Sequence, residues 1–202
     1  MRILLCDAGR IPQEDLERAA RALPESRVPR GSARPHAFAA RVVGTLLATY
    51  AAKQLSPQTD TENWQIGDAG KPCFANSPLH FSISHTDTLV ALAITLETEV
   101  GLDVERVRPM RDSFITRYFS EQEQTQIRAT GNPTEVLIRL WTAKEAVAKR
   151  HGAGLGWKVA EIDTSDAVSA FLEKDGTRYA LSLSPKCALP PLEWVDFYDL
   201  VP

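Results

Sequence analysis

Residues 100–105 alternate apolar side chains with glycine or acids, in the order Val-Gly-Leu-Asp-Val-Glu. This period of two predicts a half-buried β-strand, on which residues two apart point to the same face. We expect the valines and the leucine to enter a core, and Asp103 and Glu105 to stand side by side on the solvent-facing side. Neighbouring carboxylates repel each other unless a cation lies between them, and a hard divalent cation such as Mg²⁺ suits such a site. The alternative is an ordinary exposed strand face with scattered acids.

The composition is that of a globular chain that buries one large core or two small ones. Its 202 residues are 44% hydrophobic and carry a formal net charge of −3. The N-terminal apolar run is too short for a signal peptide, and no long uncharged apolar segment indicates a membrane span. Three cysteines without a C-x-x-C pair and four histidines without zinc-ligand spacing favour a reduced protein. We therefore expect a cytoplasmic protein with no membrane partner.

A basic stretch lies between residues 26 and 59. It has no Asp or Glu, and its basic residues include Arg27, Arg30, Arg34, Arg41 and Lys53. In a chain of net negative charge, this positive field predicts an anionic ligand. Nucleic acid is not expected, because Phe38 and Tyr50 both fit the apolar face of a helix rather than a stacking platform. A solvated arginine-rich loop is the alternative.

The order of predicted elements indicates an α+β fold. Helices are expected at 12–23, 35–53 and 120–129, and from Asn132 or Thr134 to 150; strands are expected at 2–6, near Trp64, and at 79–84, 89–95, 100–105, 168–173, 179–184 and 192–198. Strands and helices mix without a regular β-α-β alternation, which favours α+β over a doubly wound sheet. The polar link at 97–99 marks the expected boundary between two halves, 1–97 and 98–202.

The predicted helix that ends near residue 150 carries a third acid, Glu145. Trp141, Glu145 and Lys149 are four residues apart and share one helix face. The alternative is an exposed Glu145–Lys149 ion pair, which contributes little to stability. Glu123 is explained by a capping box with Ser120 at the start of the preceding helix.

Five blocks of sequence together resemble the 4′-phosphopantetheinyl transferases of the surfactin-synthetase-activating type. The blocks are Gly70-Lys71-Pro72, Phe81-Ser82-Ile83-Ser84-His85, Gly101-Leu102-Asp103-Val104-Glu105, Phe119-Ser120-Glu121-Gln122-Glu123 and the helix segment from Trp141 to Lys149, which continues into Gly152-Ala153-Gly154-Leu155. Two positions depart from the usual pattern: Ser82 stands where the family commonly has Asn, and Thr86 where a Ser often follows the His.

The resemblance implies a fold of two similar α/β halves in a pseudo-twofold arrangement, with the active site in the cleft between them. Residues 1–97 would supply adenine and phosphate contacts, and residues 98–202 the metal site and catalytic helix. Such enzymes transfer the phosphopantetheine arm of coenzyme A to a serine of an apo acyl or peptidyl carrier protein and release 3′,5′-ADP. Two complete halves in one chain make a monomer sufficient.

The resemblance also assigns roles to single residues. Asp103, Glu105 and Glu145 would bind Mg²⁺, or Mn²⁺ in its place. The expected contacts to coenzyme A are Lys149 and His85 at the phosphates and Lys71 and Pro72 at the adenine pocket. Ser84 and Asp103 are further expected contacts, and Arg27, Arg30 and Arg41 are the basic candidates nearer the N-terminus. Glu145 would act as general base towards the carrier serine, directly or through a metal-bound water. Two other functions stay open: a non-catalytic module that binds coenzyme A or a carrier, and a Mg²⁺-dependent phosphohydrolase.

A basic segment after the acidic strand suggests where a carrier protein docks. Four arginines flank three apolar residues: Arg106, Arg108, Arg111 and Arg117 around Met110, Phe114 and Ile115. A basic rim around exposed apolar anchors suits an acidic helix of a carrier protein. The alternative is an ordinary solvated segment with Phe114 in the core.

Overall fold

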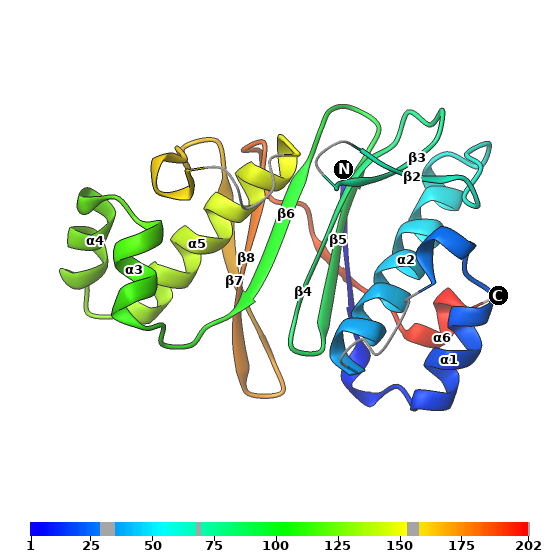
Figure 1. The fold of residues 1–202 in the computed structure, drawn as a ribbon, viewed down its shortest axis with the longest axis horizontal. Helices are drawn as coiled ribbons and strands as arrows, with labels where there is room; N and C mark the ends of the chain where they lie inside the picture. Colours follow the sequence, from blue (N-terminus) through cyan, green and yellow to red (C-terminus); the bar gives the residue numbers. More distant parts are fainter. Residues whose placement is uncertain (29–34, 68–69, 153–157, 202) are drawn as a thin grey trace. The chain divides into compact units, whose positions relative to one another are not determined.

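The computed structural model describes residues 1–28, 35–67, 70–152 and 158–201, so the predicted contact residue Arg30 lies outside the described residues. The chain divides into two compact units (Figure 1). Unit 1 is Met1–Val100 together with Pro190–Pro202, and unit 2 is Gly101–Leu189. Across the described ranges, no helix is long and apolar enough to cross a membrane.

Unit 1 is built on a four-stranded sheet. Its elements are β1 (Arg2–Asp7), η1 (Ala8–Arg10), α1 (Gln13–Arg21), η2 (Glu25–Arg27), α2 (Pro35–Leu55), β2 (Trp64–Ile66), β3 (Pro72–Phe74), β4 (His80–Thr86), β5 (Leu89–Thr95), β9 (Leu192–Trp194) and α6 (Phe197–Leu200). The strand order is β4-β5-β1-β9, with β9 parallel to β1 and the other pairs antiparallel. Strands β2 and β3 form a separate antiparallel pair.

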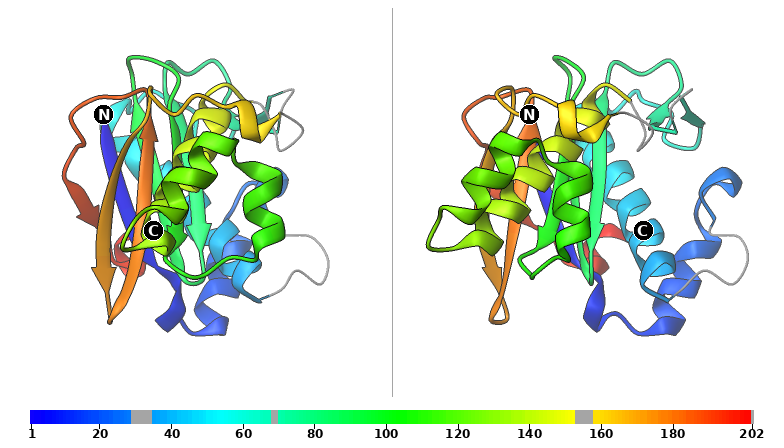
Figure 2. Two further views of the ribbon diagram at one scale, coloured as in Figure 1. Left: turned by 90° about the vertical axis from the view of Figure 1, so that its left-hand side faces the viewer. Right: turned by 60° about the vertical axis from the view of Figure 1, so that its left-hand side comes forward.

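The core of unit 1 lies between this sheet and α2, which runs alongside the strands (Figure 2). Helix α2 is rich in alanine, valine and leucine, and most of its residues are buried, as expected for a helix that is apolar on nearly all sides. Every residue of β5 is buried, and the strand lies in the interior of the sheet between β4 and β1. Gly44 allows α2 to approach β4 closely: a Cβ there would lie 2.9 Å from Cγ2 of Ile83.

Unit 2 is a three-stranded antiparallel sheet with helices. Its elements are β6 (Gly101–Arg106), α3 (Asp112–Tyr118), α4 (Glu121–Arg128), α5 (Pro133–Arg150), η3 (Val159–Glu161), β7 (Val168–Lys174) and β8 (Thr177–Ser184). The strand order is β6-β8-β7. Helix α5 contacts all three strands, and α4 packs against α5 on the side away from the sheet (Figure 1).

Local sequence signals explain where the helices of unit 2 begin and end. Both hydrogen bonds of the capping box between Ser120 and Glu123 are present at the start of α4, as predicted. Asn132 caps α5, and Pro133 follows at the first helical position. Gly152 has a φ of +64° just beyond the helix end, a conformation that glycine adopts without strain.

The structure differs from the predicted organisation in the boundary of the two units, in the C-terminal segment and in two elements that were not predicted. The boundary lies after Val100 rather than after residue 97, and residues 190–202 belong to unit 1, because β9 pairs with β1. The predicted strand 192–198 ends at Trp194, and a helical turn capped by Asp196 follows. Helix α3 and strand β3 were not predicted. The pseudo-twofold relation of two halves stays a prediction.

Candidate active site

Asp103 lies on β6, opposite Ser182 of β8, beneath helix α5. Gly101 and Asp103 share one face of the strand, and a Cβ on Gly101 would lie only 1.9 Å from the carbonyl oxygen of Ala146. Helix α5 therefore covers this face. Asp103 is 4% exposed, and the prediction of a solvent-facing carboxylate there is wrong, whereas Glu105 is half-buried at the end of the strand.

Lys149 reaches Asp103 from the last turn of α5. Its Nζ donates a hydrogen bond of 2.7 Å to Oδ1 of Asp103, and the two form an ion pair in which the Asp103 side chain is 6% exposed. Because the Asp103 end of the pair is shielded from water, its attraction is screened less than that of a fully exposed pair. The structure therefore gives Lys149 a buried acidic partner that the exposed-helix alternative does not include.

Glu145 lies one turn before Lys149 on the same helix and is half-buried. Burial raises the pKa of its carboxyl group, the negative charges of Asp103 and Glu105 raise it further, and the Lys149 ammonium opposes them. Asp103 and Glu105 on β6 therefore both act electrostatically on Glu145 of α5. The acids predicted from two distant stretches of sequence thus share one electrostatic environment within unit 2.

The donor set of this site fits a hard divalent cation. Asp103, Glu105 and Glu145 offer only carboxylate oxygens, which Mg²⁺ prefers, and their mutual repulsion is relieved by a cation. In the described part of the chain, no group of three or more His, Cys, Asp or Glu side chains is gathered closely enough to hold a metal ion. The described residues therefore supply carboxylate oxygens of the right type, but these oxygens are not arranged as a coordination shell.

Two arginines of the basic stretch lie near each other in unit 1. Arg27 lies over the ring of Trp64, 4.6 Å from its centroid, and its Nε donates to Oγ1 of Thr45 at 3.4 Å. Burial lowers the pKa of Arg27, and the positive charge of Arg41 on α2 lowers it further. Two neighbouring cations favour an anion beside them, and the anionic ligand of the basic stretch stays a prediction.

Lys71 has partners within unit 1. Its Nζ donates to the carbonyl oxygen of Val100 at 2.9 Å and forms an ion pair with Glu99. Nδ1 of His80 lies 2.9 Å from the same carboxylate. Although burial opposes it, hydrogen bonding from Lys71 and His80 lowers the pKa of Glu99. Lys71 thus holds the two residues that precede β6, and Pro72 follows it at the start of β3.

Ser84 and His85 are neighbours on β4. They lie opposite Ala91 and Val90 of β5, so their side chains point to opposite faces of the sheet. Ser84 is buried and His85 is exposed. Of this pair, His85 is therefore the residue that can meet a ligand from solvent.

Lys144 is the residue that sequence reasoning missed. Its side chain is fully buried, and its Nζ donates to the carbonyl oxygens of Val159 at 3.0 Å, Ala160 at 3.3 Å and Ile162 at 3.3 Å. It also forms an ion pair of 3.0 Å with Glu123, whose role extends beyond the capping box. The signal in the sequence is a lysine at a position where the helix repeat of apolar residues predicts a core side chain.

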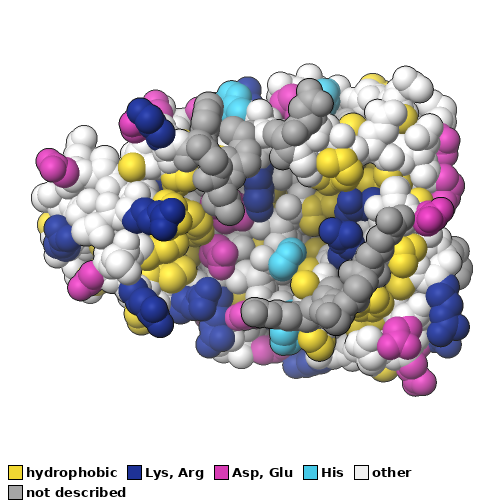
Figure 3. Space-filling view, in the orientation of Figure 1, with side chains coloured by type: hydrophobic (Ala, Val, Ile, Leu, Met, Phe, Trp, Pro, Cys, Tyr) yellow, Lys and Arg dark blue, Asp and Glu magenta, His cyan; other side chains and the backbone are white. Residues whose placement is uncertain are grey.

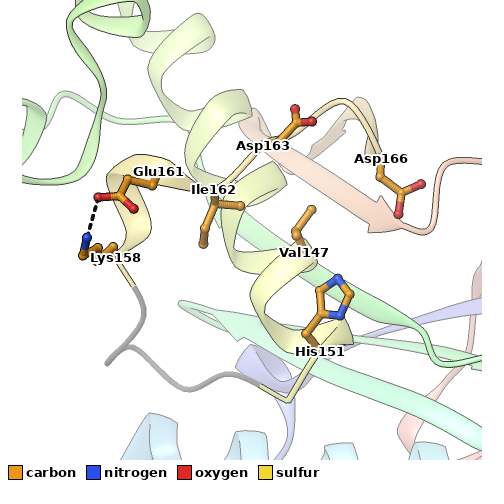
Figure 4. A pocket seen from close by; sticks show the side chains of 7 residues that line it. All are labelled: Val147, His151, Lys158, Glu161, Ile162, Asp163 and Asp166. Carbon is orange, nitrogen blue, oxygen red and sulfur yellow. Dashed lines mark ion pairs between the residues drawn. The ribbon is translucent and has the colours of Figure 1, made fainter.

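A cavity of about 410 Å³ lies on another side of α5 (Figure 4). Val147 of α5 and His151 just after the helix line it, together with residues between Lys158 and Asp166. Val147 follows Glu145 by two residues, or about 200° around the helix. The cavity therefore faces away from the carboxylates, and its charged rim includes an ion pair of 3.0 Å between Lys158 and Glu161.

The basic segment after β6 forms part of the surface over α3. Figure 3 shows apolar surface flanked by Lys and Arg side chains in this region. The arginines at 106, 108, 111 and 117 are exposed, and the three apolar residues Met110, Phe114 and Ile115 are half-buried against the core of unit 2. The ring centroid of Phe114 lies 4.7 Å from that of Trp141. The anchors are thus partly core residues, as the alternative proposed, and partly accessible.

Comparison with known proteins relates this site to one enzyme superfamily. Residues 99–187 match the model of the 4′-phosphopantetheinyl transferase superfamily. The chain is 37% identical over 105 residues to the 4′-phosphopantetheinyl transferase AcpT of Salmonella typhimurium, covering 49% of this chain and 54% of that protein. It is 32% identical over 110 residues to the 4′-phosphopantetheinyl transferase Sfp of Bacillus subtilis, covering 53% and 46%.

The matches are partial. The chain spans about half the length of these two curated relatives. The crystal structure of Thermotoga maritima holo-[acyl-carrier-protein] synthase is 21% identical, with 45% of this chain and 64% of that chain covered, and its TM-score of 0.33 is too low to support a conclusion. The segment that is similar to the 4′-phosphopantetheinyl transferase superfamily contains Asp103, Glu105, Glu145 and Lys149.

Proposed function

We propose that the protein is a Mg²⁺-dependent 4′-phosphopantetheinyl transferase of the surfactin-synthetase-activating type. It transfers the phosphopantetheine arm of coenzyme A to a serine of an apo acyl or peptidyl carrier protein. The observation that supports this most is the shared environment of Asp103, Glu105 and Glu145, which lie in the segment that matches the superfamily.

In the proposed reaction, the serine oxygen of the carrier attacks the β-phosphorus of coenzyme A. The bond from this phosphorus to the bridging oxygen breaks, and 3′,5′-ADP leaves with the electron pair. Glu145 accepts the serine proton as the general base. Lys149 neutralises charge on the phosphates. Held by Asp103, Glu105 and Glu145, Mg²⁺ would stabilise the negative charge that develops on the pyrophosphate.

Unit 1 would contribute binding rather than chemistry. We propose that Arg27 and Arg41 bind a phosphate group of coenzyme A, because burial of Arg27 and the nearby Arg41 charge favour an anion there. His85, exposed on β4, would contact a phosphate. Lys71 and Pro72 near β3, together with buried Ser84 on β4, would border the adenine. The contacts of Lys71 with Glu99 and Val100 indicate that it also fixes the chain just before β6.

The proposed carrier docks on the basic surface over α3. A monomeric state and a cytoplasmic location stay predictions. Coenzyme A and the carrier are the proposed partners, with no role for nucleic acid or a membrane.

One incubation separates the proposal from its two alternatives. The protein is mixed with coenzyme A, Mg²⁺ and several apo carrier proteins, and intact carrier masses are recorded with and without a chelator. A transferase increases the carrier mass by one phosphopantetheine group, only when Mg²⁺ is present. A binding module leaves all masses unchanged, and a phosphohydrolase cleaves coenzyme A even when no carrier is added; either result refutes the proposal.

A further inference from the structure

Helix α5 is held against the sheet of unit 2 along one side. Oγ of Ser182 and Oγ1 of Thr142 lie 2.7 Å apart, and Ala146 touches β6 at Gly101. Thr142 and Ala146 are each two residues from Lys144, or about 200° around an α-helix. Lys144 therefore points away from the sheet, on the opposite side of α5.

On that opposite side, the Lys144 ammonium joins two separate parts of the chain. Val159, Ala160 and Ile162 present three backbone carbonyl oxygens to it, and Glu123 presents Oε1. Oε2 of Glu123 accepts the backbone N–H of Ser120, so one carboxylate caps α4 and binds Lys144. These acceptors are enough for all the N–H groups of the buried ammonium. A buried charge of this kind needs a hydrogen-bond partner for each of its N–H groups.

Glu145 and Lys149 lie on the flank of α5, between the sheet and the Lys144 side. A rotation of the helix about its axis, or a slide along it, moves both side chains relative to Asp103 on β6. The sheet contacts limit that movement from one side only. The contacts of Lys144 limit it from the other side.

We propose that Lys144, together with Glu123, is a positioning residue for the catalytic face of α5. The pair fixes the rotation of the helix, and so the placement of Glu145 and Lys149, without touching the substrate. This inference rests on the proposed function. Because a shift of about 1 Å at a catalytic group costs on the order of 100-fold in rate, loss of the pair should lower kcat strongly.

Two variants separate positioning from stability. Lys144→Met keeps the length of the side chain but leaves the Glu123 carboxylate with an uncompensated charge, which destabilises a protein strongly. Adding Glu123→Gln removes that charge and keeps the capping box, which accepts Gln as well as Glu. The double variant should therefore melt at a higher temperature than Lys144→Met alone. Lys158→Met is the matched control, because Lys158 is exposed and its ion pair with Glu161 lies at the surface.

The first readout is steady-state transfer to a carrier protein. The double variant should show a kcat about 100-fold below wild type, with the KM for coenzyme A little changed, because binding groups outside α5 are untouched. Lys158→Met should keep wild-type kcat. If kcat recovers in the double variant along with its melting temperature, the pair only stabilises the fold and the proposal is overturned.

The second readout is amide hydrogen exchange without substrate. In the double variant, exchange should rise about tenfold or more at 159–162 and in the last turns of α5, while β7 and β8 stay protected. Unchanged exchange in α5 overturns the proposal even if wild type transfers nothing. A wild-type protein without transfer refutes the proposed function instead, and the exchange result still decides whether Lys144 holds the helix.

Discussion

Strand β6 and helix α5 approach each other closely at Gly101, and we predict that Gly101→Ala moves Asp103 on β6 away from Glu145 and Lys149 on α5. An added Cβ would lie 1.9 Å from the carbonyl oxygen of Ala146 and 2.5 Å from the backbone nitrogen of Arg150. Real Cβ atoms stay at least 3.0 Å from such neighbours, so the helix backbone must move by about 1.1 Å, the difference between 3.0 and 1.9 Å. Both neighbours are backbone atoms, so no side-chain rotation relieves the overlap.

The displacement has two measurable consequences. Overpacking of this kind costs about 1–3 kcal/mol of the free energy of unfolding, which urea denaturation measures. Moving α5 also stretches the 2.7 Å contact of Lys149 with Asp103 and shifts Glu145, so the transfer rate should fall about 100-fold.

Gly131→Ala is the matched control for this substitution. A Cβ at Gly131 meets no described atom within 4 Å, and we expect unchanged or slightly higher stability with normal transfer. The reasoning is refuted if Gly101→Ala unfolds within about 0.5 kcal/mol of wild type and transfers phosphopantetheine at the normal rate.

Three further predictions concern the charge at the site, the docking surface and a buried thiol. Asp103→Asn should keep the fold by circular dichroism and lower the transfer rate by at least about 100-fold, and normal turnover or loss of the fold would contradict this. Arg108→Glu combined with Arg111→Glu should raise the KM for the carrier and leave that for coenzyme A unchanged; equal effects on both would remove the docking surface. Burial raises the pKa of Cys6 to about 12, so iodoacetamide at about pH 8 should alkylate exposed Cys187 and spare Cys6 in the native protein. The unfolded thiol ionises at its ordinary pKa of about 8.5, whereas the buried thiol stays neutral up to about pH 12. The stability that the neutral Cys6 thiol contributes is therefore fully present below about pH 8.5 and is lost as the pH rises towards 12. Equal alkylation of both cysteines would contradict the burial argument.

Local patterns predicted the elements that carry the site. The alternation at 100–105, the capping box at Ser120 and the periodic helix ending near 150 each correspond to an observed element. These signals are local, because a strand or a helix start is encoded within a few neighbouring residues. The grouping of Glu145 with Asp103 came from the family resemblance, and the pKa of Glu145 reflects the same proximity.

The burial of Asp103 could not be predicted from alternation. A period of two distinguishes the two faces of a strand, but it does not reveal that a helix some forty residues later covers the polar face. The close approach of the helix is possible because Gly101 has no Cβ. A hydrophobicity pattern does not register this property.

Long-range pairing explains the other differences. Strand β9 returns to unit 1 because Leu192–Trp194 pairs with β1, about 190 residues earlier in the chain, and no local pattern specifies that partner. Helix α3 begins without a side-chain cap and none of its residues is fully buried, so its sequence lacks the usual helix signals.

The most direct test of the central claim, that three carboxylates on β6 and α5 form a catalytic metal site, is the Mg²⁺ dependence of transfer in Glu105→Gln and Glu145→Gln. Initial rates of carrier modification are measured for both variants and wild type over a wide range of Mg²⁺ concentration. Our account predicts that high Mg²⁺ partly restores Glu105→Gln, which lacks a ligand. Glu145→Gln should stay about 10²–10⁴-fold slower, because it lacks the base as well. Wild-type rates for both variants at ordinary Mg²⁺ would contradict the account, and full rescue of Glu145→Gln would assign the proton to another acceptor.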